Sequence, residues 1–154
     1  DYDKTKQAVL SLKSYIDAQP KSIQLCHIDA VPDNFLFVTG KDGSEEIKLT
    51  DWEYAGMQDP HLDVAMFIIY AMYDRDSAEK LIDLYFSDGC DKATRLKIYC
   101  YIAVSGLVWS NWCEFKRHCG VEFGAYAQRQ YDYAREYTKI FFKEYREAFG
   151  RDYV

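Results

Sequence analysis

Basic residues are in the minority in this 154-residue chain, which has 19 Lys and Arg against 25 Asp and Glu. The formal charge of −6 argues against a general surface for nucleic acid or anionic membranes. No apolar run is long enough to span a bilayer, and no secretory signal pattern opens the chain. We therefore expect a cytoplasmic protein without nucleic-acid partners or membrane insertion, and the oligomeric state stays open.

Paired cysteine motifs are also missing. The five cysteines are odd in number and irregularly spaced. This pattern indicates free thiols in a reducing compartment rather than a disulfide framework or a zinc site. Apolar residues make up 49% of the chain and charged residues 29%, as is typical of a globular protein. The length suits a single domain with a sizeable core.

The spacing of apolar residues changes along the chain. It predicts a first helix over 3–17, ended by Pro20, and then short strands with a turn of glycine and charged residues at 40–43. Beyond Pro60 the period becomes helical. We predict an α+β fold, mostly helical, with a small β-hairpin followed by a helical bundle; the strands are expected at 23–26, 35–38 and 47–50, and the later helices at 61–73, 76–86, 94–117 and 122–149.

Polar residues gather on either side of the predicted hairpin. His27, Asp29 and Asn34 form the pattern H-x-D-x-x-x-x-N before it, and Asp51 follows it. Phosphoryl transfer from ATP needs a carboxylate that faces the attacking hydroxyl and oxygen ligands for Mg²⁺. Because a hairpin returns its two ends to one place, these residues are candidates for that chemistry.

These motifs resemble the small-molecule kinases of the aminoglycoside phosphotransferase and choline kinase group. The stretch D-W-E-Y-A-G-M at 51–57 is similar in particular to bacterial choline kinases, and the resemblance extends from about residue 20 to the end. It implies a protein-kinase-like C-terminal lobe, with ATP and Mg²⁺ as cofactors and a small amino alcohol, choline above all, as substrate. The expected product is phosphocholine.

The resemblance also implies roles for individual residues. Asp29 would be the catalytic base, His27 a structural member of the catalytic loop, and Asn34 and Asp51 the Mg²⁺ ligands. Glu53 would lie near the metal or the cationic substrate. Taken from the residues alone, Asp29 and Asn34 are also compatible with ordinary loop capping.

Asp63 resembles the aspartate that braces the catalytic loop from the next helix in this family. Its alternative interpretation is an exposed charge favoured by the dipole at a helix N-terminus.

Aromatic residues suggest how a quaternary ammonium would be bound, since such a cation offers no hydrogen-bond donor and needs ring faces. Trp109 and Trp112 share one face of a helix, and Gly106, one turn earlier, leaves room beside them. Choline kinases have a similar W-x-x-W pair. The proposed cage consists of Tyr54, Trp109, Trp112, Phe123 and Tyr126, with Glu53 supplying negative potential. The alternative is that these rings belong to the core.

A Gly-rich loop and a strand lysine that would grip ATP phosphates are missing from this sequence. We therefore expect residues 1–154 to form a single C-terminal kinase-like lobe without the N-terminal ATP-covering lobe, and to be nearly inactive alone. The catalytic loop is expected at 25–36, the metal-binding segment at 49–57 and the helical substrate-binding bundle at 60–150. The alternatives are a kinase for ethanolamine, thiamine or an aminoglycoside, and a non-catalytic binding lobe; Phe123 and Val31 depart from the family pattern and keep the choice of alcohol open.

Overall fold

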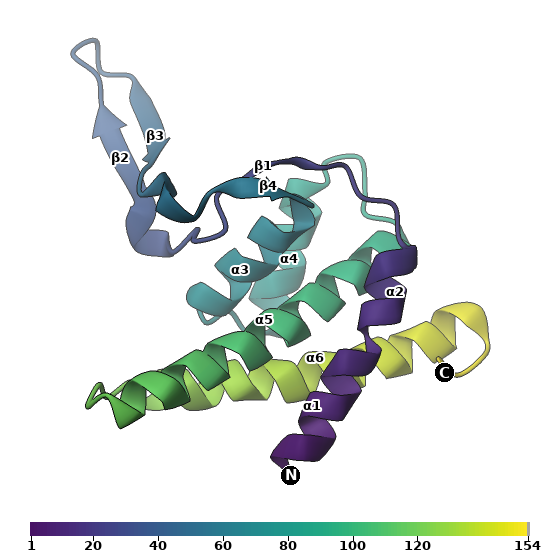
Figure 1. Cartoon of the computed structure of the whole chain (residues 1–154). Coiled ribbons are helices and arrows are strands. Elements are labelled where there is room, and N and C mark those ends of the chain that lie inside the picture. The colour runs from purple at the N-terminus through teal and green to yellow at the C-terminus, as the bar shows by residue number, and fades with distance from the viewer. Residues whose placement is uncertain (154) are drawn as a thin grey trace.

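The structure is a computed structural model that describes residues 1–153. Figure 1 shows a bundle of helices from which one β-hairpin projects. The elements in chain order are α1 (Tyr2–Ser11), α2 (Lys13–Ala18), β1 (Gln24–Cys26), a short 3-10 turn (Pro32–Asn34), β2 (Phe35–Thr39), β3 (Glu45–Leu49), a second 3-10 turn (Trp52–Tyr54), β4 (Gly56–Gln58), α3 (His61–Tyr70), α4 (Arg75–Tyr85), α5 (Lys92–His118) and α6 (Ala125–Phe149).

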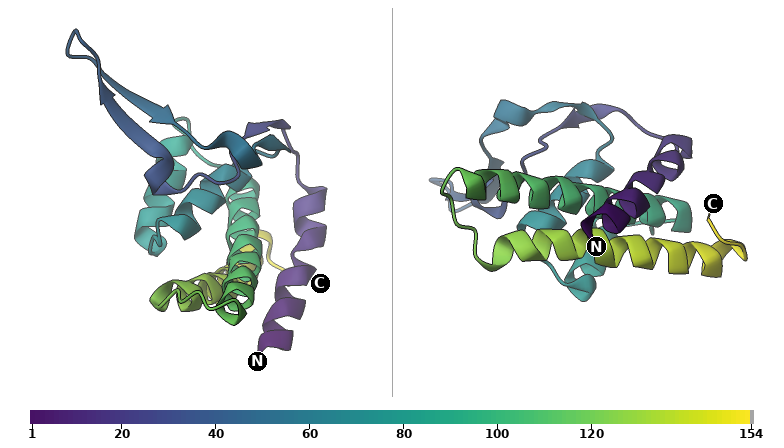
Figure 2. Two further views of the ribbon diagram at one scale, coloured as in Figure 1. Left: turned by 60° about the vertical axis from the view of Figure 1, so that its left-hand side comes forward. Right: turned by 60° about the horizontal axis from the view of Figure 1, so that its bottom comes forward.

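Helices α5 and α6 are the longest elements and lie side by side in antiparallel directions (Figures 1 and 2). Asp91 caps the start of α5 by accepting a hydrogen bond from the backbone N–H of Thr94. Gly106 allows the two helices to approach closely, because a Cβ there would lie 2.7 Å from the backbone oxygen of Gln130. The lack of a side chain at Gly106 therefore serves helix packing.

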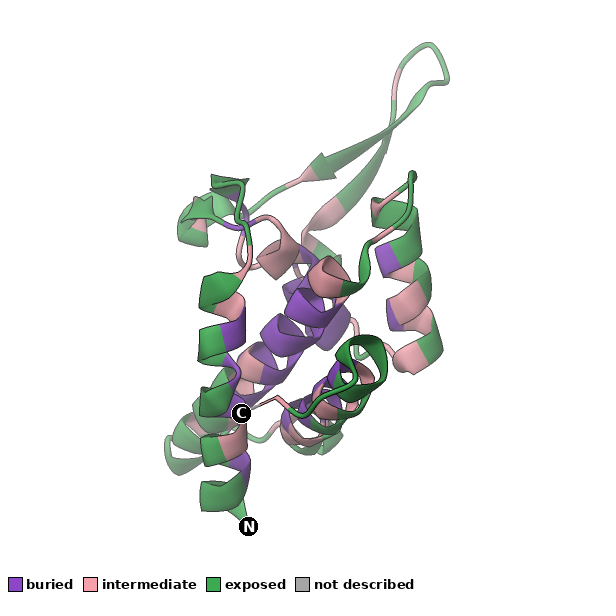
Figure 3. Ribbon diagram, turned by 90° about the vertical axis from the view of Figure 1, so that its right-hand side faces the viewer, coloured by how far each residue is buried: buried purple, intermediate pink, exposed green. Residues whose placement is uncertain are grey.

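The other helices cover this pair. Helix α3 packs on α5, and α1 and α2 cross it at a different face (Figure 2). Figure 3 shows the buried residues concentrated along α5 and its neighbours. The largest fully buried side chains include Tyr99, Tyr133, Tyr137, Phe141, Leu12, Ile68, Ile69, Ile82, Leu96, Ile98 and Ile102. None of the described helices is both long enough and apolar enough to cross a membrane.

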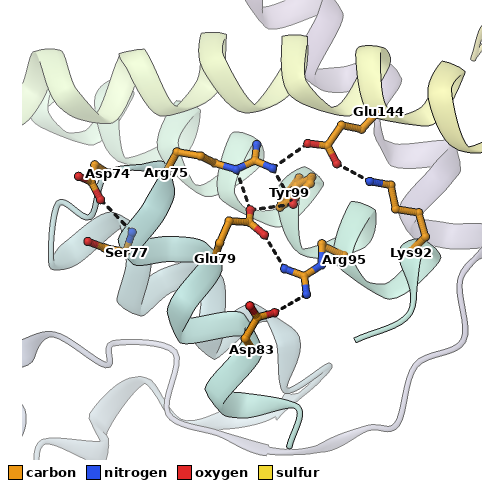
Figure 4. Close-up of polar contacts among 9 residues, drawn as sticks. All are labelled: Asp74, Arg75, Ser77, Glu79, Asp83, Lys92, Arg95, Tyr99 and Glu144. Atoms are coloured by element: carbon orange, nitrogen blue, oxygen red, sulfur yellow. Dashed lines mark hydrogen bonds and ion pairs between the residues drawn. The ribbon is translucent and has the colours of Figure 1, made fainter. Parts of the chain in front are cut away.

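Helix α4 is attached through charged side chains. Arg75 contacts Glu79 on its own helix and Glu144 on α6, each at 2.7 Å, and Arg95 of α5 pairs with Glu79 and Asp83 (Figure 4). The pairs share partners and are partly buried, so they hold the helices more firmly than isolated surface pairs would.

Two small antiparallel sheets flank residues 27–34, which belong to the predicted catalytic loop. Strand β1 pairs with β4, with Cys26 opposite Gly56, and β2 pairs with β3, with Phe35 opposite Leu49. The β2–β3 hairpin extends away from the helices (Figure 1) and is mostly exposed (Figure 3). Its attachment lies at its base, where the Phe35 ring meets Phe67 of α3 at 5.4 Å between centroids.

The sequence-based prediction of a mostly helical α+β fold with a hairpin is confirmed. Two details differ. The first predicted helix is divided at Leu12, which lies between α1 and α2. Strand β4 was not predicted, because its three residues show no alternating pattern and its partner β1 is far away in sequence.

Candidate functional site

Asp63 holds the catalytic loop from the first turn of α3. Its two carboxylate oxygens accept hydrogen bonds from the backbone N–H groups of His27 at 2.7 Å and Ile28 at 2.8 Å. Hydrogen bonds to a charged acceptor are stronger than those between neutral groups. This geometry favours the bracing interpretation of Asp63 over a charge that only responds to the helix dipole.

The brace acts on strained backbone. Ile28 has a φ of 70°, which is a costly conformation for a β-branched residue. Such strain is typical of functional sites and persists only where surrounding contacts impose it. Here Asp63 supplies one of those contacts, and the strained residue directly precedes Asp29.

His27 is a structural part of the same loop. Its ring is buried, with 2% exposure, and Nε2 lies 2.7 Å from the backbone oxygen of Thr50. The ring also meets Trp52 edge-on at 4.8 Å between centroids. His27 thus joins the catalytic loop to the segment after the hairpin.

Asp29 lies on the wall of a large apolar cavity. This cavity has a volume of about 710 Å³ and is lined by Ile28, Asp29, Val31, Tyr54, Met66, Tyr70, Trp109, Trp112, Phe123 and Tyr126. Asp29 Oδ1 accepts a hydrogen bond of 2.7 Å from the hydroxyl of Tyr70. A carboxylate beside an aromatic cavity could face the hydroxyl of a small cationic alcohol.

The cavity rings form a continuous series from α3 to α6. Centroid distances are 5.6 Å from Tyr70 to Trp109, 5.5 Å from Trp109 to Trp112, 5.3 Å from Trp112 to Phe123 and 6.4 Å from Phe123 to Tyr126. These rings are partly exposed, unlike the buried tyrosines of the core. The structure therefore places four of the five expected aromatic residues in this series, and the fifth, Tyr54, lines the same cavity.

Other expectations fare differently. Glu53 is exposed and is not among the residues that line the cavity, so its contribution to cation binding stays a prediction. Gly106 faces α6 and does not make room beside Trp109, contrary to the expectation. Tyr70 and Met66 were not identified from the sequence as cavity residues. Both lie on α3 at helical spacing from Asp63, which was expected to brace the loop, and this spacing could have indicated them.

The base of the hairpin brings Asn34 and Asp51 near each other. Asn34 comes directly before β2, Asp51 follows β3 after Thr50, and the backbone N–H of Thr50 donates to the oxygen of Asn34 at 3.0 Å. Asp51 has a φ of 65°, a left-handed conformation that aspartate tolerates better than most residues.

The donor groups at this base fit Mg²⁺. The Asn34 side-chain N–H donates to the backbone oxygen of Asp29 at 3.0 Å, which leaves its amide oxygen free to act as a ligand. Asp51 has no side-chain hydrogen bond or ion pair with any of residues 1–153. The same residues contain no group of three or more His, Cys, Asp or Glu that could hold a metal. Mg²⁺ is usually bound by one or two carboxylates together with phosphate oxygens, so the chemistry of Asn34 and Asp51 is compatible with this ion.

Comparison with known proteins identifies the family of this chain. The family model described as choline/ethanolamine kinase matches residues 1–88, which is more than half of the chain. The chain belongs to the choline/ethanolamine kinase family.

Two kinds of relative extend the comparison. Protein LicA of Haemophilus influenzae is 30% identical over 121 residues, which cover 71% of this chain and 41% of LicA. The crystal structure of choline kinase LicA from Streptococcus pneumoniae has a TM-score of 0.70 at 28% identity, with 91% of this chain and 48% of that chain covered. A structure of LicA in complex with AMP has a TM-score of 0.71 at 28% identity and covers 92% of this chain and 47% of that one. This member of the choline/ethanolamine kinase family thus spans less than half the length of the relatives it matches.

Proposed function

We propose that this chain carries the catalytic loop and the alcohol-binding cavity of an ATP- and Mg²⁺-dependent kinase that phosphorylates choline. The observation that carries the proposal is the Asp29 carboxylate on the wall of a cavity built from aromatic rings. Family membership supports a phosphotransferase, and the similar choline kinase LicA supports choline as the alcohol.

Each residue of the site would have a distinct role in phosphoryl transfer. Asp29 would accept the proton of the bound hydroxyl while the alcohol oxygen forms a bond to the γ-phosphorus of ATP. The bond from that phosphorus to the bridging oxygen breaks, and ADP leaves. Asn34 and Asp51 would hold Mg²⁺, which neutralises charge on the phosphates when bound. Asp63 and His27 keep the loop in place and do not touch the reacting atoms.

The chemistry of the cavity favours choline among the alternative substrates. A quaternary ammonium is attracted to ring faces, and Trp109 and Trp112 supply the strongest of them. An aminoglycoside carries several ammonium groups and would need several carboxylates, whereas Asp29 is the single carboxylate among the lining residues. Ethanolamine carries a primary ammonium that needs hydrogen-bond acceptors, which an aromatic wall offers poorly.

Nucleotide binding is supported by the AMP complex of the similar LicA structure. We propose that residues 1–154 correspond to the C-terminal lobe of the kinase. Its parts are the catalytic loop at 25–36, the metal-binding segment at 49–57 and the substrate-binding bundle at 60–150. The Gly-rich loop and the strand lysine that cover ATP would then lie outside these residues.

The decisive experiment is calorimetric titration of choline and, separately, of ethanolamine into the full-length protein. Choline should bind more tightly, and Trp109→Ala should weaken its binding about tenfold or more, since a desolvated cation–π contact is worth roughly 2 kcal/mol. Phe115→Ala is the matched control, because Phe115 is an exposed aromatic residue of the same helix that does not line the cavity.

A second variant separates catalysis from binding. Asp29→Ala should keep choline binding and lower the rate of phosphocholine formation by roughly 100-fold or more. Equal binding of choline by wild type and Trp109→Ala would refute the cage. Absence of turnover in the wild-type protein, with choline binding retained, would favour a lobe that only binds.

A further inference from the structure

Tyr70 connects the catalytic carboxylate to the wall of the aromatic cavity. It is the last residue of α3, and its hydroxyl donates to Asp29 Oδ1 at 2.7 Å. Its ring meets that of Trp109 at 5.6 Å between centroids. One side chain therefore contacts both the proposed base and the proposed cation site.

The surroundings of Tyr70 favour its protonated hydroxyl, which is the form that donates a hydrogen bond. Burial raises the pKa of Tyr70 far above its usual range, and the hydrogen bond to Asp29 and the charge of Asp29 raise it further. The side chain of Trp109 acts in the opposite direction and lowers the pKa of Tyr70.

This hydrogen bond has a directional consequence for Asp29. An ionised carboxylate only accepts hydrogen bonds, and a donor on Oδ1 fixes its rotation and leaves Oδ2 for another proton. Asp63 and the strained Ile28 fix the backbone of the loop, but neither forms a hydrogen bond with the Asp29 side chain. Among the hydrogen bonds of residues 1–153, the one from Tyr70 is the contact that orients this carboxylate.

We propose that Tyr70 is a positioning residue that couples occupancy of the aromatic cavity to the orientation of Asp29. The coupling rests on the proposed function of Asp29. A cationic head group that packs against Trp109 restricts the movement of the neighbouring Tyr70 ring, and the hydroxyl of Tyr70 orients the Asp29 carboxylate. An alcohol that fills the cavity therefore meets a correctly oriented base. An alcohol without such a head group would leave Tyr70 less constrained and would react more slowly.

The test is Tyr70→Phe in the full-length protein, because this change removes the hydroxyl and keeps the ring. The expected result is a fall in kcat of roughly 10- to 100-fold, the range for loss of one hydrogen bond to a charged group, while KM and the Kd for choline change by less than about twofold. The matched control is Tyr73→Phe. Tyr73 lies just beyond the same helix and enters the described hydrogen bonds through its backbone alone, so this variant should match the wild type.

The outcomes separate this inference from the proposed function. If wild type phosphorylates choline and Tyr70→Phe retains its kcat, the coupling is wrong and the proposed function stands. A parallel loss of kcat, choline affinity and melting temperature would assign Tyr70 a merely structural role, which also overturns the coupling. If the wild-type protein neither binds choline nor forms phosphocholine, the proposed function itself has failed. Choline calorimetry well below the melting temperature keeps the test valid for a less stable variant.

Discussion

The proposed catalytic loop at 25–36 and the proposed metal-binding segment at 49–57 lie next to each other, but they are held in different ways. The loop is tied to α3 by the carboxylate of Asp63 and by the hydroxyl of Tyr70. The segment is held by contacts with the loop and within itself, such as the bond between His27 Nε2 and the Thr50 oxygen, and the bond of 2.8 Å from the Trp52 indole N–H to the oxygen of Leu49. Its Asp51 carboxylate stays exposed.

Under the proposed function, this difference distinguishes the base from the metal ligands. The proposed base is oriented by residues of this chain before any substrate binds, and strained backbone at Ile28 is part of that preparation. The oxygens proposed as metal ligands, on the side chains of Asn34 and Asp51, instead have no hydrogen-bond partner among residues 1–153, as expected of groups that bind an ion and phosphate oxygens. Changes in the two regions should therefore affect different measurements.

The largest effect is expected from Asp51→Asn. Asparagine tolerates the left-handed backbone at this position, so the fold should be preserved while the charge of the proposed Mg²⁺ ligand is lost. Kinase activity of the full-length protein, as proposed above, should fall roughly 100-fold or more, because even the outer partners of metal ligands are worth 10- to 100-fold. Kinase assays across a Mg²⁺ titration and thermal unfolding measure the two effects.

The matched control for Asp51→Asn is Glu46→Gln on β3, which removes an exposed negative charge from the same hairpin. Activity and melting temperature should stay at the wild-type values. A lowered melting temperature in Asp51→Asn would show that the segment is held by Asp51 and would remove the contrast with the loop.

Asp63→Ala should lower the stability of the protein, which Asp51→Asn should leave unchanged. It removes two hydrogen bonds to a charged acceptor and releases the strained loop, so the free energy of unfolding should fall by about 3 kcal/mol. Chemical denaturation measures this loss. Asp76→Ala removes an equivalent acidic residue from the first turn of α4, where the helix dipole accounts for less than about 1 kcal/mol. If both variants lose the same free energy of unfolding, Asp63 is only a charge stabilised by the helix dipole and the bracing interpretation is wrong.

The sequence was sufficient for those parts of the fold and site that depend on local patterns. The helices, the hairpin and the order of the polar motifs follow from the spacing of apolar and turn-forming residues. Trp109 and Trp112 were expected on one face because residues three apart share a face of a helix, and the structure agrees.

The missing parts depend on tertiary contacts that no local pattern encodes. Tyr70 looks like one more ring in an apolar helix, and its hydroxyl becomes informative only when Asp29, far away in sequence, is placed beside it. From the sequence, Gly106 could make room in the cavity or allow two helices to pack closely. The structure shows the second, because α6 lies against Gly106. The pairing of β1 with β4 is a long-range contact between two three-residue strands.

The smallest effect is expected from Phe37→Ser on the projecting hairpin. Phe37 is 81% exposed and lies opposite the exposed Ile47, so its loss removes a cross-strand contact and no core packing. The free energy of unfolding should change by about 0.5 kcal/mol, whereas Phe141→Ala in the core should cost roughly 3–5 kcal/mol. Urea denaturation of both variants provides the comparison. A cost above about 1.5 kcal/mol for Phe37→Ser would mean that the hairpin packs against another surface in solution, because a cross-strand pair alone contributes less than that.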